Sequence, residues 1–209
     1  MPDEMAAHWQ QVYAERNAEE MSWTEEMPAA SLALIEEAAL PLDAAILDLG
    51  GGASRLAGEL LQRGYSDVTV ADISTEALER AKADLGNGAA GVTWIEADVR
   101  DHDFGRRFDL WHDRAVFHFM IAPAEQSGYL AVLNRTLRPD GHLIIATFSP
   151  EGPSECSGLP VKRYDAAAIA NTFGSDFNLV SSRLKDHRTP SGAVQPFTYA
   201  HLQQIPRAR

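Results

Sequence analysis

Cysteine and basic residues are scarce in this sequence. Its 209 residues contain one cysteine, Cys156, and 18 Lys and Arg against 30 Asp and Glu, which gives a net charge of -12. One cysteine cannot form an internal disulfide, so the protein is expected in a reducing compartment. The excess of acid argues against a broad DNA- or RNA-binding surface, because binding phosphate groups needs a basic surface.

Signals for export or membrane insertion are also missing. The N-terminus has neither the basic region nor the apolar stretch of a secretion signal. No run approaches the 18 apolar residues typical of a membrane-spanning helix. We therefore expect a cytoplasmic protein with no membrane partner. With 45% hydrophobic residues and no internal repeat, the chain is long enough for a single domain with one substantial core.

A glycine-rich turn stands out against this background. Residues 45–55 read Ala-Ile-Leu-Asp-Leu-Gly-Gly-Gly-Ala-Ser-Arg, which predicts a buried strand, a turn and the start of a helix at Leu56. Such a turn brings backbone N–H groups close to a ligand. The third glycine of a dinucleotide fingerprint would fall on Arg55, and no Gly-Lys-Ser/Thr tripeptide of a P-loop follows. The alternative is a tight turn that binds nothing.

Acidic residues follow three predicted strands in succession. Asp48 ends the first strand, Asp72 the strand over residues 67–73, and Asp98 the strand over residues 92–97. Asp72 lies 22 positions after Gly50, where nucleotide-binding α/β domains place the carboxylate that binds ribose hydroxyls. The alternative for Asp72 is an acid that stabilises a helix N-terminus. Since carboxyl ends of parallel strands share one edge of a sheet, the ordered set predicts an adenosine-type site.

The rest of the chain alternates between helical and strand patterns until its tail. We expect helices over residues 5–20, 28–39, 74–85, 124–137 and 165–173, with Ser74 and Asp165 as N-caps. Further strands are expected from Phe108 to the 112–114 segment and over 142–148, with a turn at 138–141 and a loop at 149–160. The tail predicts a hairpin of strands 177–185 and 194–205, with Pro196 near the start of the last strand or at a bulge.

The Asp-x-Gly-x-Gly pattern of Asp48, Gly50 and Gly52 resembles motif I of the class I S-adenosylmethionine (SAM) methyltransferases, with Ser54 in place of the third glycine. The chain is most similar to a subgroup of small, single-domain bacterial and mitochondrial-type members. The similar segments are Ser22-Trp23, the His-Asp-Arg-Ala-Val-Phe-His-Phe run over 112–119, and Thr-Pro-x-Gly-x-x-Gln over 189–195.

This resemblance implies a three-layer, Rossmann-like α/β fold with a seven-stranded, mostly parallel sheet and a C-terminal antiparallel hairpin. Residues 1–209 would form one methyltransferase domain, with a helical cap over the cofactor (1–42), a SAM-binding core (43–150) and a substrate-side part (151–209). The cofactor would be SAM and its product S-adenosyl-L-homocysteine. The acceptor would be a small molecule or a protein side chain such as lysine, and no nucleic acid. An NAD(P)-dependent oxidoreductase and a non-catalytic SAM-binding domain are the alternatives, and the oligomeric state stays open.

The resemblance also implies a set of site residues. Those expected to bind the cofactor are Tyr13, Trp23, Asp48, Gly50, Gly51, Gly52, Asp72, Ile73, Asp98, Val99 and His112. The candidates for catalysis are His112, Asp113 and His118, although a base is needed only if the acceptor must lose a proton. For the histidines and the aromatic residues, packing in the core is the alternative. No metal site is expected, because the histidines lack ligand spacing.

Overall fold

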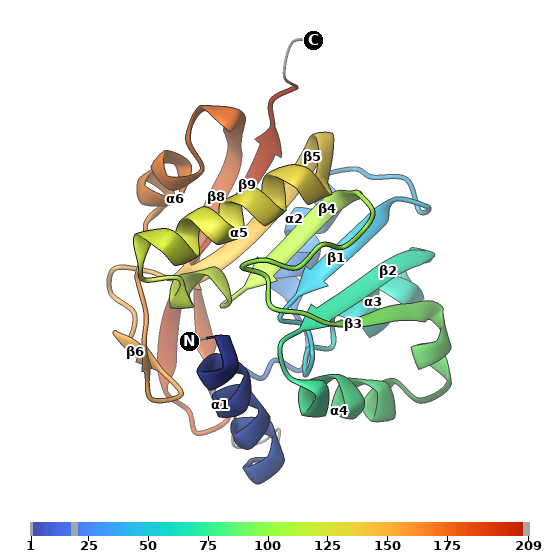
Figure 1. Cartoon of the computed structure of the whole chain (residues 1–209), viewed down its shortest axis with the longest axis vertical. Coiled ribbons are helices and arrows are strands. Elements are labelled where there is room, and N and C mark those ends of the chain that lie inside the picture. The colour runs from blue at the N-terminus through green and yellow to red at the C-terminus, as the bar shows by residue number, and fades with distance from the viewer. Residues whose placement is uncertain (1, 18–20, 207–209) are drawn as a thin grey trace.

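A single seven-stranded sheet organises the computed structural model, which describes residues 2–17 and 21–206. Its strand order is β3-β2-β1-β4-β5-β9-β8 (Figure 1). The first five strands run parallel, and β9 pairs antiparallel with both β5 and β8. The predicted α/β fold with a C-terminal hairpin is therefore confirmed. The strands are β1 (Ala45–Leu49), β2 (Asp67–Asp72), β3 (Val92–Glu96), β4 (Phe108–Arg114), β5 (Leu137–Phe148), β8 (Phe177–Arg188) and β9 (Val194–Gln204).

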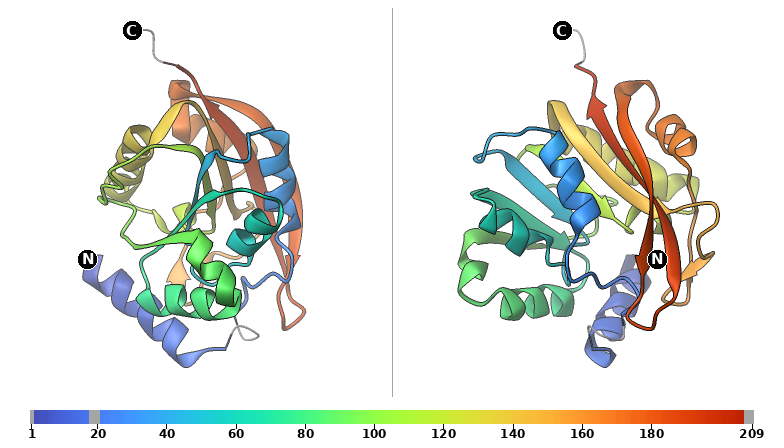
Figure 2. Two further views of the ribbon diagram at one scale, coloured as in Figure 1. Left: turned by 90° about the vertical axis from the view of Figure 1, so that its right-hand side faces the viewer. Right: turned by 180° about the vertical axis from the view of Figure 1, so that it is seen from behind.

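Helices cover both faces of the sheet and complete three layers. In Figures 1 and 2, α2 and α3 lie on one face and α5 on the other. Phe173 of α6 contacts the rings of Phe117 and Tyr129, which puts α6 on the face of α5. The helices are α1 (Pro2–Glu15), α2 (Ala29–Glu37), α3 (Leu56–Gln62), α4 (Thr75–Leu85), α5 (Pro123–Thr136) and α6 (Ala166–Phe173), with 3₁₀ turns η2 (Gly86–Gly91), η3 (Phe117–Phe119) and η4 (Gly174–Asp176).

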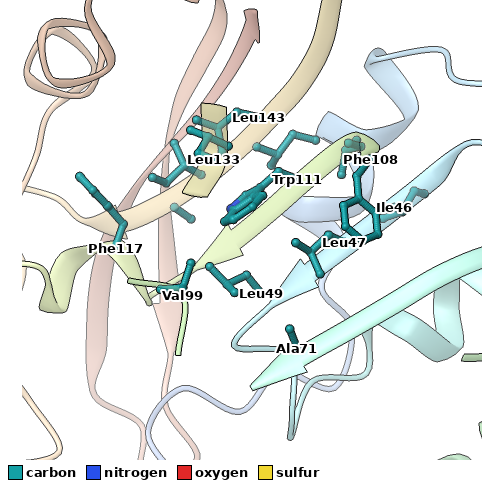
Figure 3. Packing of buried hydrophobic residues seen from close by; sticks show 14 of the residues in the cluster. Ile46, Leu47, Leu49, Ala71, Val99, Phe108, Trp111, Phe117, Leu133 and Leu143 are labelled. Atoms are coloured by element: carbon teal, nitrogen blue, oxygen red, sulfur yellow. The ribbon is translucent and has the colours of Figure 1, made fainter. Parts of the chain in front are cut away.

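The core lies on both sides of the central strands. Every residue of β1 is buried, as expected for a parallel strand covered on both faces. Figure 3 shows Trp111 of β4 among buried side chains that include Leu47 of β1 and Leu133 of α5. The Trp111 indole Nε1 donates to the Tyr129 hydroxyl at 2.9 Å, so its polar atom is satisfied inside this core. This packing holds the carboxyl ends of the strands in place.

Several element boundaries differ from those expected. The first helix spans Pro2–Glu15 and not residues 5–20, of which 18–20 lie outside the described part of the chain. The predicted turn at 138–141 is a bulge inside β5: pairing with β4 jumps from Phe108↔Leu137 to Leu110↔His142, and Asp140 has a φ of 63°. The predicted loop at 149–160 contains a small hairpin of β6 (Glu155–Cys156) and β7 (Leu159–Pro160).

Other local predictions are confirmed. The Ser74 hydroxyl accepts from the Ala77 N–H at 3.2 Å, and the Asp165 carboxylate accepts from the Ala168 N–H at 2.7 Å, so both act as N-caps. Pro196 lies near the start of β9, where the strand pairs with β8 but not yet with β5, so its missing N–H breaks no bond to the central strand. Within residues 2–17 and 21–206, no helix has the length and apolar character needed to cross a membrane.

Candidate functional site

The glycine turn after β1 is packed too tightly for any side chain. Gly50 has a φ of +66°, a conformation that favours glycine, and its N–H donates to the Ala71 carbonyl at 2.7 Å. A Cβ on Gly50 would overlap the Val116 side chain, and one on Gly51 would overlap the Asp48 carboxylate. A Cβ on Gly52 would overlap both Ala77 and the Asp72 carboxylate. The glycines therefore let the backbone approach two buried acids closely.

Asp72 joins this turn to the end of β2. One of its oxygens accepts from the Gly52 N–H at 3.0 Å and the other from the Ser74 N–H at 2.9 Å. Burial raises the pKa of Asp72 to about 6, although the two backbone hydrogen bonds oppose the shift. The carboxylate thus lies beside the glycine turn, and each of its oxygens keeps a further lone pair for a ligand hydroxyl.

Asp98 is held by a neighbouring arginine. The Arg100 side chain donates to it from Nε at 2.8 Å and from Nη2 at 2.5 Å, and the Arg100 backbone N–H donates at 2.9 Å. Burial alone would raise the pKa of Asp98, but the hydrogen bonds and charge of Arg100 outweigh it and hold the pKa below its usual value. Asp98 is therefore a fixed, ionised hydrogen-bond acceptor.

Two adjoining cavities open at this edge of the sheet. The first has an empty volume of about 780 Å³ and is lined by Asp72, Ile73, Asp98 and Val99. The second, of about 500 Å³, is lined by Asp48, Gly51 and His112. Residues that line both are Tyr13, Trp23, Leu49, Gly50 and Arg114.

The predicted cofactor-binding residues thus meet in one place. All of them except Gly52 line at least one of the two cavities. Gly52 lies behind the others, where its N–H holds the Asp72 carboxylate. Residues from six separate stretches of the chain are brought together in this way.

An aromatic cluster from the N-terminal part covers the site. Figure 1 shows α1 on the side of the sheet to which the arrows of β1 and β4 point. The Trp9 and Trp23 rings meet edge to face at 5.6 Å, and the Tyr13 and Trp23 rings at 6.0 Å. Trp9 also contacts Phe119 at 5.2 Å. The three N-terminal rings therefore pack on one another and line the first cavity.

His112 has both ring nitrogens engaged. Its Nδ1 lies 2.7 Å from an Asp48 oxygen, and its Nε2 lies 2.8 Å from the Ser31 hydroxyl. His112 and Asp48 are register partners on β4 and β1, which brings the two side chains together. The second Asp48 oxygen is buried and has no hydrogen-bond partner among the described residues. His112 therefore positions Asp48, and the free oxygen of Asp48 remains for a ligand.

Asp113 lies outside both cavities. Its carboxylate accepts from the Val116 N–H at 2.9 Å, the Phe117 N–H at 3.1 Å and the Tyr129 hydroxyl at 2.7 Å. Burial raises its pKa to about 6, against the effect of these donors. All these partners belong to the turn after β4 or to the core, so the geometry favours a structural role over the predicted catalytic one.

His118 is also buried away from both cavities. Its ring contacts Phe119 at 4.5 Å and Phe148 at 4.9 Å, and neither ring nitrogen has a hydrogen-bond partner among the described residues. Burial, and to a smaller degree the charge of Arg114, lowers its pKa to about 3. The side chain is therefore neutral near pH 7 and packs as an aromatic ring, which again favours a structural role.

His118 should make folding sensitive to acid. Its folded pKa of about 3 lies below the unfolded value of about 6.5, so between these pH values only the unfolded chain binds the proton. Stability is therefore lost as pH falls, by about 2 kcal/mol between pH 7 and 5. The raised pKa values of Asp72 and Asp113 act in the opposite direction. Urea unfolding of His118→Leu at both pH values should show a loss about 2 kcal/mol smaller than in wild type; an equal loss would contradict the assignment.

Two site residues were not singled out from the sequence. Arg114 has no predicted role of its own within the 112–119 run, yet it lines both cavities. Ser31 of α2 reaches His112 across 81 positions of sequence. No rule of sequence spacing connects Ser31 or Arg114 with the predicted site residues. Only the closeness of Arg114 to His112 in the sequence could have drawn attention to Arg114.

Comparison with known proteins finds methyltransferases among the similar sequences. The family profile of a methyltransferase domain matches residues 46–141. A malonyl-[acyl-carrier protein] O-methyltransferase of Anoxybacillus flavithermus is 31% identical over 105 residues, which are 49% of this chain and 38% of that protein. The chain therefore matches well under half of the length of this curated relative.

Solved structures share the fold over nearly the whole chain. One, described as the conversion of a disulfide bond into a thioacetal group during echinomycin biosynthesis, has a TM-score of 0.78 at 23% identity and covers 98% of this chain and 94% of its own. The 1,6-didemethyltoxoflavin-N1-methyltransferase of Burkholderia thailandensis, with bound S-adenosylhomocysteine, has a TM-score of 0.69 at 22% identity and covers 98% and 91%. At these identities the likeness shows the fold.

Proposed function

The chain belongs to the class I SAM-dependent methyltransferases, and on that premise we propose that it transfers the methyl group of SAM to a small-molecule or protein side-chain acceptor. The observation that carries the proposal is the meeting of two cavities at Gly50, one lined by Asp72 and Asp98 and the other by Asp48. Together they offer acceptors for an adenosine at one end and for an amino acid ammonium at the other.

Each predicted residue has a distinct task in this arrangement. The Asp72 carboxylate would accept from the ribose hydroxyls, and Asp98 and Val99 would hold the adenine. The unpartnered oxygen of Asp48 would accept from the ammonium group of the methionine part, while His112 keeps Asp48 in place. The unfilled lone pairs and the close-packed glycine turn both fit a ligand of this kind.

The protein would contribute by orienting the two reactants and excluding water, and it would form no covalent bond to them. When bound, SAM supplies an electrophilic methyl group on a sulfonium, and its transfer is an in-line displacement. Trp23 and Tyr13 line both cavities and would exclude water where they meet. Alignment of the acceptor with the methyl group supplies most of the acceleration in such reactions. The names of the similar proteins divide between O- and N-methyl transfer, so they do not select the accepting atom.

The same proposal includes the organisation of the chain. Residues 1–42 would act as the cap over the cofactor, 43–150 as its binding core and 151–209 as the substrate side of one domain. We place the protein in the cytoplasm, without a nucleic-acid partner, on the grounds of its single cysteine and its net charge of -12.

Titration calorimetry with SAM, and separately with NAD, tests the function. We expect saturable binding of SAM and none of NAD. Asp72→Ala should weaken SAM binding at least tenfold, because a hydrogen bond to a charged group is worth about 1.5–3 kcal/mol. Absence of SAM binding to a folded sample freed of co-purified ligand would overturn the proposal.

The pH dependence of the same titration provides a control. Because the pKa of Asp72 is about 6 in the free protein, and the ionised carboxylate is the better acceptor, wild-type affinity for SAM should be level above pH 7. It should then fall by up to about tenfold for each pH unit below 6. The Asp72→Ala variant should lack this part of the pH dependence.

A further inference from the structure

Arg114 stands where the two cavities meet. It ends β4, its side chain is 11% exposed, and it lines both cavities together with Gly50 and Trp23. In the proposed function this is where the adenosine and methionine parts of SAM would join, and therefore where the methyl group would be. In that case the guanidinium would lie beside the methyl group.

The guanidinium is anchored but keeps one unused donor. Its Nη1 donates to the Trp23 carbonyl at 2.9 Å and its Nε to the Tyr199 hydroxyl at 3.1 Å, and the group stacks over the Phe197 ring at 4.8 Å. Its Nη2 is buried and has no hydrogen-bond partner among the described residues. A buried charged donor left unsatisfied is costly, so it points to a group that is supplied from outside.

A carboxylate already lies against this arginine. Glu25 places an oxygen 3.2 Å from Nε, and it comes from the N-terminal segment that also carries Trp23. The Glu25 side chain is 21% exposed and lines the second cavity. The position is therefore chemically suited to a carboxylate, and Glu25 occupies part of it.

In the proposed function the other acids of the two cavities bind the cofactor or a neighbouring side chain, so they do not serve as the base for the acceptor. Asp48 is bonded to His112, Asp98 to Arg100, and Asp72 to two backbone N–H groups. An ammonium or hydroxyl acceptor would have to lose a proton before it could attack. A carboxylate is already ionised at neutral pH and needs no base.

We propose that the methyl acceptor carries a carboxylate and that Arg114 binds it through Nη2, an inference that rests on the proposed function. The acceptor carboxylate competes with Glu25 for the guanidinium. One oxygen bound to Arg114 leaves the other free to attack: the new O–C bond forms, the C–S bond breaks, and its electron pair stays on sulfur. A methyl ester and a neutral thioether result, and no proton moves. Arg114 is thus a specificity-determining residue that favours carboxylic acids over amines.

Calorimetry on protein saturated with S-adenosylhomocysteine tests this. The probes are malonate, hexanoate and benzoate, each compared with its amide. Wild type should bind at least one acid and bind its amide at least tenfold more weakly. Arg114→Gln should weaken binding of that acid at least tenfold, whereas Glu25→Gln should tighten it by removing the competing carboxylate. Arg138→Gln is the matched control, since Arg138 pairs with Asp109 at the opposite end of β5 and should leave acid binding unchanged within twofold.

Three results would overturn the inference: no preference for any acid over its amide, unchanged acid binding in Arg114→Gln, or an equal loss of S-adenosylhomocysteine affinity in that variant. The last would assign Arg114 to the cofactor's own carboxylate. If Arg114→Gln does not fold, two measurements still test the inference. They are the comparison of each acid with its amide in wild type and the affinity of Glu25→Gln for the acid. Failure of wild type to bind S-adenosylhomocysteine at all would instead count against the proposed function.

Discussion

Asp113→Ala is expected to lower the free energy of unfolding by about 3–6 kcal/mol. The change leaves the Val116 and Phe117 N–H groups and the Tyr129 hydroxyl without their acceptor, and each unsatisfied buried donor costs about 1–3 kcal/mol. The hydroxyl of Tyr129 also accepts from Trp111, so the disturbance reaches the centre of the core. Urea unfolding measures the loss.

A matched acid on the surface provides the control for Asp113. Asp67 is 35% exposed and pairs with Arg106, so Asp67→Ala should cost no more than about 1 kcal/mol. A stable Asp113→Ala protein that binds SAM but transfers no methyl group would contradict the structural role and restore the catalytic one.

Gly52→Ala is expected to weaken SAM binding by about 100-fold or more. The added Cβ would overlap the Ala77 methyl group and the Asp72 carboxylate, and Ala77 is fully buried, so the acid must move. Overpacking costs about 1–3 kcal/mol, and a displaced Asp72 loses a charged hydrogen bond to the ribose worth about 1.5–3 kcal/mol. A loss of about 2.7 kcal/mol corresponds to 100-fold in affinity.

Gly91→Ala is the control for Gly52→Ala. It tests whether replacing any glycine with alanine weakens SAM binding. A Cβ on Gly91 would meet Leu61 at 3.6 Å, an ordinary contact, far along the chain from the turn. Calorimetry should find its SAM affinity within twofold of wild type. An equal loss in both variants, or unchanged affinity in Gly52→Ala, would show that the packing behind the glycine turn does not control binding.

The cofactor side of the site could be predicted because its signals are local. A strand, a glycine turn and an acid at the end of each strand are read from neighbouring residues, and the parallel topology then gathers Asp48, Asp72 and Asp98 at one edge. The three acids line the two cavities, as that reasoning requires.

The catalytic candidates show where local reasoning stops. Successive side chains of a strand point to opposite faces of a sheet. In β4, His112 reaches Asp48 and Ser31 of α2, while Asp113, the next residue, reaches Tyr129 of α5 on the other face. The pattern predicted that the pair lies at a strand end, but it did not say which of the two faces the cavity.

The sequence by itself determined the α/β fold, the glycine turn after β1, the order of the three acids and the C-terminal hairpin, because backbone preferences and hydrophobic periodicity act over short stretches of chain. Tertiary structure alone decided that Asp113 and His118 are buried away from the cavities, and that Arg114 meets Trp23 and Tyr199, 91 and 85 positions away. Those contacts depend on how the N-terminal segment and β9 pack against the end of β4, which no short stretch of sequence encodes.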